Sequence, residues 1–122
     1  MTRRDPHLPF RQIADHAREA IEMARGASRE DLDRDRKLSL SLTRLLEIVG
    51  EAATRLSPAA RSRYPEIPWT EIVGMRNRLI HGYDDVDLDV VWRVVQSDLP
   101  DLVAALERRR GEWLDAGGVE PS

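Results

Sequence analysis

The spacing of apolar residues is the feature that most constrains the fold of this 122-residue chain. From Pro9 to Arg25 apolar residues recur every three or four positions, which is the period of one face of an α-helix, and Gly26 follows as a helix stop. The same period returns throughout the chain between its termini. No alternating pattern of the kind that predicts a strand competes with it. The chain is therefore predicted to be all-α.

Three further helical segments are predicted after the first one. The second carries an apolar stripe from Leu38 to Leu56, and SRED at residues 28–31 can form a capping box for it. The third is expected over residues 68–83, and the fourth begins at the acidic turn DDVDLD, residues 84–89. Short connectors between such segments are typical of a helical bundle.

The fourth segment contains Ser97 and Pro100, which indicate a break or a restart of the helix. The count of helices is therefore four to five. We predict a single domain over residues 1–115, folded as an antiparallel helical bundle. A disordered tail is expected over residues 116–122.

The composition excludes several classes of protein. Charged residues make up 34% and hydrophobic residues 41%, a balance typical of a soluble, helix-rich chain. A net charge of -3 excludes a uniformly basic nucleic-acid binder but allows a local basic site. Without cysteine there is no disulfide and no thiolate site. No apolar run approaches the roughly 20 residues of a membrane span, and no signal-peptide core is seen, so the cytoplasm is the expected compartment.

The stretch GMRNRLIHGYDD, residues 74–85, concentrates polar chemistry in the third segment. On a helical wheel, Arg76 falls inside the apolar arc of its neighbours, where a guanidinium is costly unless it is paired. One interpretation is a structural ion pair with Glu47 or Glu51 of the second segment. The other is contact with an anionic ligand at a subunit interface, since the planar guanidinium can bind two phosphate oxygens at once.

His81 is the side chain of this stretch whose unperturbed pKa lies near neutrality, as general acid–base catalysis requires. Asn77 lies four residues earlier, which places it on the same helix face, where it can orient the imidazole or donate to a phosphate. A histidine at a helix end is nevertheless more often solvated than catalytic, and Tyr83 can simply pack. The spacing of these residues suggests a functional site but does not decide between a catalytic and a structural role for them.

The remaining candidates are weaker. His7 and His16 are interpreted as structural or exposed. No histidine–carboxylate cluster has the spacing of metal ligands, so neither a metal nor another cofactor is predicted. Gly50 in mid-helix destabilises the helix by about 1 kcal/mol relative to Ala. Its presence indicates that another helix approaches closely at this position, and a dimer interface is one candidate for that contact.

The segment RNRLIHGY resembles the R-x4-H-x-Y motif of the HEPN superfamily, in its HepT-like branch of toxin components. LLEIVGEAATRL, YPEIPWTEIVGMRNRLIHGYDDVDLDVVW and DLPDL resemble that branch in the same order, over nearly the whole chain. The resemblance implies a metal-independent endoribonuclease toxin, neutralised by a nucleotidyltransferase antitoxin of the MntA type. It also implies that Arg76 and His81 are catalytic in a cleft between two protomers, that Asn77 supports them, and that Tyr83 receives AMP.

A homodimer would make this chemistry workable. Metal-free RNA cleavage benefits from a base and an acid, and each protomer supplies one motif histidine. A two-fold axis repeats every residue, so one His81 can be the base and its mate the acid, while two Arg76 side chains stabilise the phosphate. AMP on Tyr83 would add bulk and negative charge to a site built for RNA phosphate. The alternative is a non-catalytic interaction module that binds the nucleotidyltransferase as its modification substrate; a purely structural helical protein is a third possibility.

Overall fold

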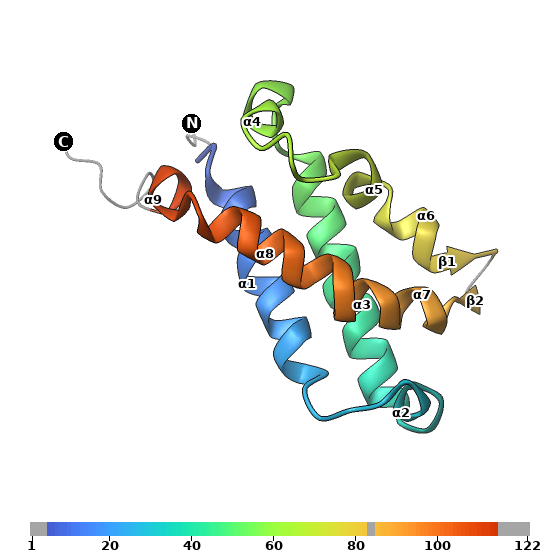
Figure 1. The fold of residues 1–122 in the computed structure, drawn as a ribbon. Coiled ribbons are helices and arrows are strands. Elements are labelled where there is room, and N and C mark those ends of the chain that lie inside the picture. The colour runs from blue at the N-terminus through green and yellow to red at the C-terminus, as the bar shows by residue number, and fades with distance from the viewer. Residues whose placement is uncertain (1–4, 83–84, 115–122) are drawn as a thin grey trace.

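The computed structural model describes residues 5–82 and 85–114, which form a helical fold (Figure 1). The helices are α1 (Leu8–Met23), α2 (Arg29–Arg34), α3 (Arg36–Thr54), α4 (Pro58–Ser62), α5 (Trp69–Val73), α6 (Met75–Leu79), α7 (Leu88–Arg93), the π-helix η1 (Val94–Asp98), α8 (Leu99–Glu107) and α9 (Arg110–Trp113). Two short strands, β1 (Ile80–His81) and β2 (Asp85–Val86), are the exception. The all-α prediction is confirmed apart from this pair. The tail predicted over residues 116–122 lies outside the described residues.

Helices α1 and α3 pack side by side and run in opposite directions at the centre of the molecule (Figure 1). The continuous helical stretch α7–η1–α8 crosses them, and α8 packs on α1. Helices α5 and α6 pack along α3. None of the helices in the described part of the chain is long and apolar enough to cross a membrane. The arrangement agrees with the predicted antiparallel bundle.

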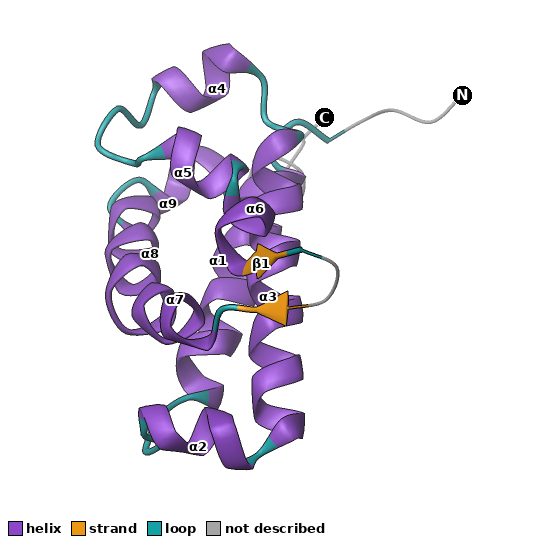
Figure 2. Ribbon diagram, turned by 90° about the vertical axis from the view of Figure 1, so that its right-hand side faces the viewer, coloured by secondary structure: helices purple, strands orange, loops and turns teal. Residues whose placement is uncertain are grey.

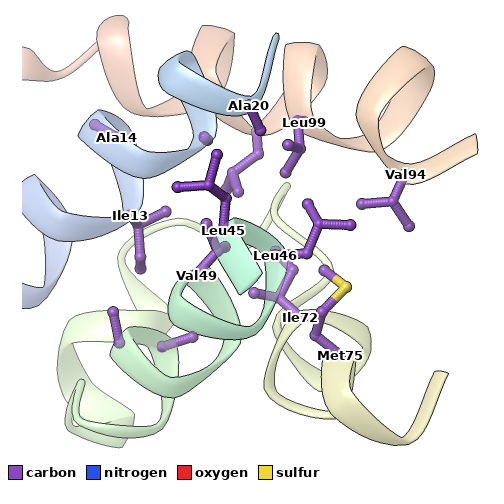
Figure 3. Packing of buried hydrophobic residues seen from close by; sticks show 14 of the residues in the cluster. Ile13, Ala14, Ala20, Leu45, Leu46, Val49, Ile72, Met75, Val94 and Leu99 are labelled. Atoms are coloured by element: carbon purple, nitrogen blue, oxygen red, sulfur yellow. The ribbon is translucent and has the colours of Figure 1, made fainter. Parts of the chain in front are cut away.

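The core lies where these helices meet. The buried face of α1 is the predicted apolar stripe, made of Pro9, Phe10, Ile13, Ala14, Ala17 and Ala20. On α3, Leu46 and Val49 are fully buried, and they lie between α1, the η1–α8 stretch and α6 (Figure 3). Met75 of α6 points into this same core (Figure 3). Helix α6 is therefore fixed to the rest of the domain through its apolar side.

Asp35 divides the predicted second segment into two helices. Its backbone is extended (φ -110°, ψ 97°), and its carboxylate accepts a hydrogen bond from the Leu38 N–H at 3.1 Å, which caps α3. The predicted capping box does form, between Ser28 and Asp31, but it starts the separate short helix α2. An aspartate at an N-cap accepts a hydrogen bond from one free N–H of the new helix. The chain can therefore turn at Asp35 without leaving that N–H unpaired.

The predicted break near Pro100 is instead a wider helical turn. Pro100 has no N–H to donate to the carbonyl four residues earlier, so the regular α-helical ladder cannot continue through it. The chain passes through η1, where the N–H of Leu99 donates to the carbonyl of Val94, five residues back. The chain remains helical into α8, with Pro100 in its first turn, where a missing N–H costs little.

Candidate active site

The segment that carries the polar motif is not a single helix. Helix α5 gives way to α6 at Gly74 (φ -85°, ψ 15°), a residue type with low helix propensity. Helix α6 then ends at Leu79, because Ile80 adopts an extended conformation (φ -116°, ψ 122°). The prediction of one helix over residues 68–83 is therefore wrong. His81 lies on β1, so the helical wheel does not describe its position.

A short antiparallel ribbon follows α6. Ile80 pairs with Val86 and His81 pairs with Asp85. Gly82 has a φ of +79°, a conformation that favours glycine over other residues. The side chains of Ile80 and Val86 pack against the hydrophobic core, while His81 and Asp85 are exposed. The alternation of a strand thus turns His81 toward solvent.

Gly50 sets how closely α6 approaches α3. A Cβ at this position would lie 2.9 Å from the Met75 Cβ and 3.0 Å from the Ile72 carbonyl oxygen. The close helix approach predicted for Gly50 is confirmed. It joins α3 to α5 and α6 within one chain, and this contact accounts for a glycine at this position.

Arg76 is exposed, so the prediction that it lies within the apolar arc is wrong. The buried stripe of α5 and α6 is narrower than that arc and consists of Ile72, Met75 and Leu79. The suggested partners Glu47 and Glu51 instead lie 3.5 and 3.8 Å from Arg44 of their own helix. Within the described residues the Arg76 side chain makes no hydrogen bond or ion pair, while its backbone carbonyl accepts the Ile80 N–H at the end of α6. Arg76 is therefore a surface residue of α6.

Arg78, two residues further on, has a different environment. It is half-buried and pairs with Asp98 at 3.2 Å, which links α6 to η1. The pair lies at the wall of a hollow of about 490 Å³ between α5–α6 and α8. Arg76, Asn77 and His81 do not line this hollow. Arg76 and Asn77 are exposed on α6 and His81 is exposed on β1, and Figure 2 shows β1 directly following α6.

The closest described partner of His81 is Asp87. The His81 Nε2 lies 3.1 Å from Asp87 Oδ2, and the side chains are 59% and 31% exposed. The other Asp87 oxygen accepts the Val90 N–H at 3.2 Å and caps α7. The Asp87 N–H donates to the Leu79 carbonyl at 2.7 Å. One residue thus joins the end of α6, the motif histidine and the start of α7.

The pKa of the Asp87 carboxyl lies below its ordinary value. The hydrogen bond from the Val90 N–H is the main cause; partial desolvation opposes it, and the contact with His81 adds to it. Asp87 is therefore a carboxylate at neutral pH. Sequence reasoning missed its role, although the signal was present as an aspartate at the start of the next helix, six residues after His81.

The lowered pKa of Asp87 predicts a pH dependence of stability. A carboxyl with a depressed pKa stabilises the folded state above its unfolded pKa, and that contribution is lost as pH falls through the folded pKa. Asp87→Asn keeps an acceptor for the cap but cannot titrate. The difference in free energy of unfolding between wild type and Asp87→Asn should shrink as pH drops below about 4. Urea unfolding at several pH values measures it, and a difference that stays constant down to the acid end contradicts the assignment.

The other predicted site residues have mixed outcomes. Asn77 is exposed on α6, but it does not share a helix face with His81, because the helix ends between them. Tyr83 lies outside the described residues. His16 is half-buried with its Nδ1 2.7 Å from the Gln12 carbonyl oxygen, which agrees with a structural role. Over residues 5–82 and 85–114, no group of three or more His, Asp or Glu side chains is placed to hold a metal ion.

Comparison with known proteins adds the family. The family model described as "Ribonuclease HepT-like" matches residues 13–109. The "Probable ribonuclease HepT" of Thermococcus cleftensis is 40% identical over 96 residues, which cover 75% of this chain and 87% of that protein. A protein of Methanocaldococcus jannaschii named "Putative RNase" is 31% identical over 107 residues, covering 88% of this chain and 98% of the other. No solved structure matches the chain significantly. This chain therefore belongs to the ribonuclease HepT-like family of the HEPN superfamily.

Proposed function

We propose that this protein is a homodimeric, metal-independent endoribonuclease whose active site combines Arg76 and His81 of two protomers. The observation that carries the proposal is that Arg76, Asn77 and His81 are exposed on α6 and β1 instead of lining the hollow between α5–α6 and α8. A single copy therefore does not enclose a phosphate with these groups. A two-fold axis at this surface would bring a second set to face the first.

The chemistry requires no added reactant. One His81 removes the proton of a ribose 2′-hydroxyl, and the 2′-oxygen then attacks the adjacent phosphorus. The bond from phosphorus to the 5′-oxygen breaks, and the His81 of the partner protonates that oxygen. The two Arg76 guanidinium groups stabilise the negative charge that builds on the phosphate, and Asn77 donates a supporting hydrogen bond. The products are a 2′,3′-cyclic phosphate and a 5′-hydroxyl.

We also propose the biological setting of this activity. The protein is the toxin of a toxin–antitoxin pair, and its antitoxin is a nucleotidyltransferase of the MntA type. That partner attaches AMP to Tyr83, two residues after His81 in the chain. The support is the family membership together with a tyrosine in the position that the motif requires. The negative charge of the added AMP would compete with RNA phosphate for the Arg76 guanidinium groups.

The proposal predicts that two neighbouring arginines respond differently to substitution. Arg76→Ala should lower the RNA cleavage rate by on the order of 10²-fold or more, since it removes two charges from the composite site. It should leave the free energy of unfolding within about 0.5 kcal/mol, because the residue is exposed. Arg78→Ala is the matched control. It breaks the pair with Asp98, costs up to about 1 kcal/mol of stability, and retains cleavage.

The outcome is read from cleavage rates and urea unfolding on the same protein preparations. Equal loss of cleavage in Arg76→Ala and Arg78→Ala would assign both effects to the fold, and full activity in Arg76→Ala would remove this residue from the site.

The function is tested with purified protein in excess EDTA. An RNA oligonucleotide and a DNA of the same sequence are incubated with wild type and with His81→Ala purified in parallel. We expect wild type to cut the RNA, leaving the cyclic phosphate, and to leave the DNA intact because it has no 2′-hydroxyl. Sedimentation equilibrium on the same samples should give a dimer.

Three results would overturn the proposal. Equal cleavage by wild type and His81→Ala would point to a contaminant, and a monomer that cleaves at full rate would exclude the composite site. Absence of RNA cleavage, together with acceptance of AMP on Tyr83 from a nucleotidyltransferase, would favour the non-catalytic interaction module.

A further inference from the structure

We infer that Asp87 is a positioning residue for His81, which holds the ring proton on Nε2 and so makes Nδ1 the nitrogen that exchanges protons with RNA. The inference rests on the proposed ribonuclease function and extends it to a residue outside the R-x4-H-x-Y motif. It assigns both a partner for the catalytic ring and the ring atom that reacts.

Asp87 has the fixed position that such a role requires. Its backbone N–H is bound to the Leu79 carbonyl at 2.7 Å, and one carboxylate oxygen is bound to the Val90 N–H at 3.2 Å. The end of α6 and the start of α7 therefore determine where the second oxygen points. That oxygen lies 3.1 Å from the His81 Nε2.

His81 needs such a partner, because most of its own side chain is exposed. Within residues 5–82 and 85–114, Asp87 is the hydrogen-bond partner of its ring. A surface histidine without a partner samples several rotamers, and catalysis by proton transfer depends on the ring staying within reach of the reacting atom. The contact with a residue anchored at two helix ends reduces that freedom.

The hydrogen bond also specifies the tautomer. The Val90 N–H, and to a lesser extent His81 itself, hold the pKa of the Asp87 carboxyl below its ordinary value, so the group is ionised at neutral pH. An ionised carboxylate can only accept a hydrogen bond, so Nε2 must be the donor. In the neutral ring the lone pair is then on Nδ1, on the opposite side of the imidazole from Asp87.

The same contact serves both members of the proposed dimer. The His81 that acts as base accepts the 2′ proton at Nδ1, and the ring becomes an imidazolium whose charge faces the Asp87 carboxylate. The His81 that acts as acid begins in that state and releases its Nδ1 proton to the 5′-oxygen. Nε2 keeps its proton throughout, so Asp87 itself takes no proton.

The capping role of Asp87 must be separated from its contact with His81. Asp87→Ser provides a hydroxyl that still caps α7 but is too short to reach the imidazole. Asp87→Asn keeps the cap and the length, but its amide can either donate or accept, so it no longer specifies the tautomer. Asp35→Ser is the matched control, since Asp35 caps α3 through the Leu38 N–H in the same way, with no ring bound to it.

The test combines two measurements on the full-length dimer. The first is the RNA cleavage rate in EDTA. The second is the ring ¹⁵N spectrum of histidine-labelled protein, which reports the tautomer of each imidazole. His16 is an internal reference of the opposite kind, because its Nδ1 faces the Gln12 carbonyl oxygen at 2.7 Å and must be the donor there. The spectrum of wild type should therefore show His81 as the Nε2–H form and His16 as the Nδ1–H form.

We expect Asp87→Ser to cleave RNA on the order of 10²-fold more slowly, within the roughly 10²–10⁴-fold that a positioned acid or base contributes. Its His81 signals should move toward the tautomer mixture of an unbonded ring, while the His16 signals stay in place. Asp87→Asn should lose part of both effects. Asp35→Ser should match wild type in both measurements.

Each failure has its own signature. Unchanged His81 signals in Asp87→Ser would overturn the inference, as would unchanged cleavage with shifted signals; in both cases His81-dependent cleavage by wild type still stands. Wild-type protein that shows no His81-dependent cleavage would overturn the proposed function, and with it the catalytic role of Asp87, whatever the ring spectrum shows.

Discussion

His81→Ala is expected to lower the RNA cleavage rate by about 10²- to 10⁴-fold, because it removes both the base and the acid of the proposed composite site. The stability of the domain should change little. The side chain is 59% exposed, so the free energy of unfolding should stay within about 0.5 kcal/mol of wild type. Cleavage rates in EDTA and urea unfolding on the same preparation measure the two effects.

His16→Ala is the matched control for this substitution. His16 lies on α1 and bonds to the Gln12 carbonyl oxygen of its own helix, away from the motif. Its replacement should leave the cleavage rate unchanged. Loss of activity in both histidine variants would indicate a general effect on the protein.

Mixed dimers test whether the two copies of His81 act together. A dimer with one intact protomer and one His81→Ala protomer retains a single imidazole, which can serve as base or as acid but not as both in one step. We expect its rate to lie near that of the doubly substituted dimer. A rate near half of wild type would show that each protomer cleaves independently, and it would contradict the composite site.

Gly50→Leu is expected to lower the free energy of unfolding by about 3 kcal/mol or more, since overpacking of a tight contact displaces backbone as well as side chains. Even a single Cβ here would lie 2.9 Å from the Met75 Cβ and 3.0 Å from the Ile72 carbonyl oxygen. The Ile72 contact is to backbone, so a rotamer change cannot relieve it. Helix α6 would have to move away from α3, which also displaces Arg76 and should reduce RNA cleavage in the folded fraction.

Gly111→Leu provides the comparison for Gly50. Gly111 is also a helix residue, but a Cβ built there meets no atom within 4 Å. The substitution should be neutral or stabilising by up to about 1 kcal/mol through helix propensity. Urea unfolding of both variants gives the two values, and equal stability of Gly50→Leu and Gly111→Leu would show that the α3–α6 contact is looser than described.

The sequence alone was sufficient to predict the all-α fold class and many of the core residues. The stripe of α1, from Phe10 to Ala20, and that of α3, with Leu46 and Val49, are buried as predicted. These predictions succeeded because a helix that buries one face must repeat apolar residues at its own period. The close approach at Gly50 was also predicted. A glycine in mid-helix destabilises the helix relative to alanine, so its presence indicates a tight contact that requires the smallest residue.

The path of the chain through the motif depended on tertiary structure. A helical wheel for residues 68–83 assumes one uninterrupted helix and assigns each residue to a face from its sequence position alone. It therefore misplaced Arg76 and His81. Helix α3 packs at Gly50 against the narrow buried stripe of Ile72, Met75 and Leu79. Arg76 lies beside this stripe and remains exposed to solvent. The wheel also cannot show that the backbone becomes extended at Ile80.

Local sequence patterns therefore determined which segments are helical and which faces are apolar, because those properties repeat along the chain. The sequence also named Arg76, Asn77, His81 and Tyr83 as candidates through their resemblance to a motif. Only the tertiary structure brought Asp87 to within 3.1 Å of His81. That contact arises because β1 and β2 pair and the Asp87 N–H binds the Leu79 carbonyl, and this backbone pairing of residues 79–81 with residues 85–87 has no period along the sequence.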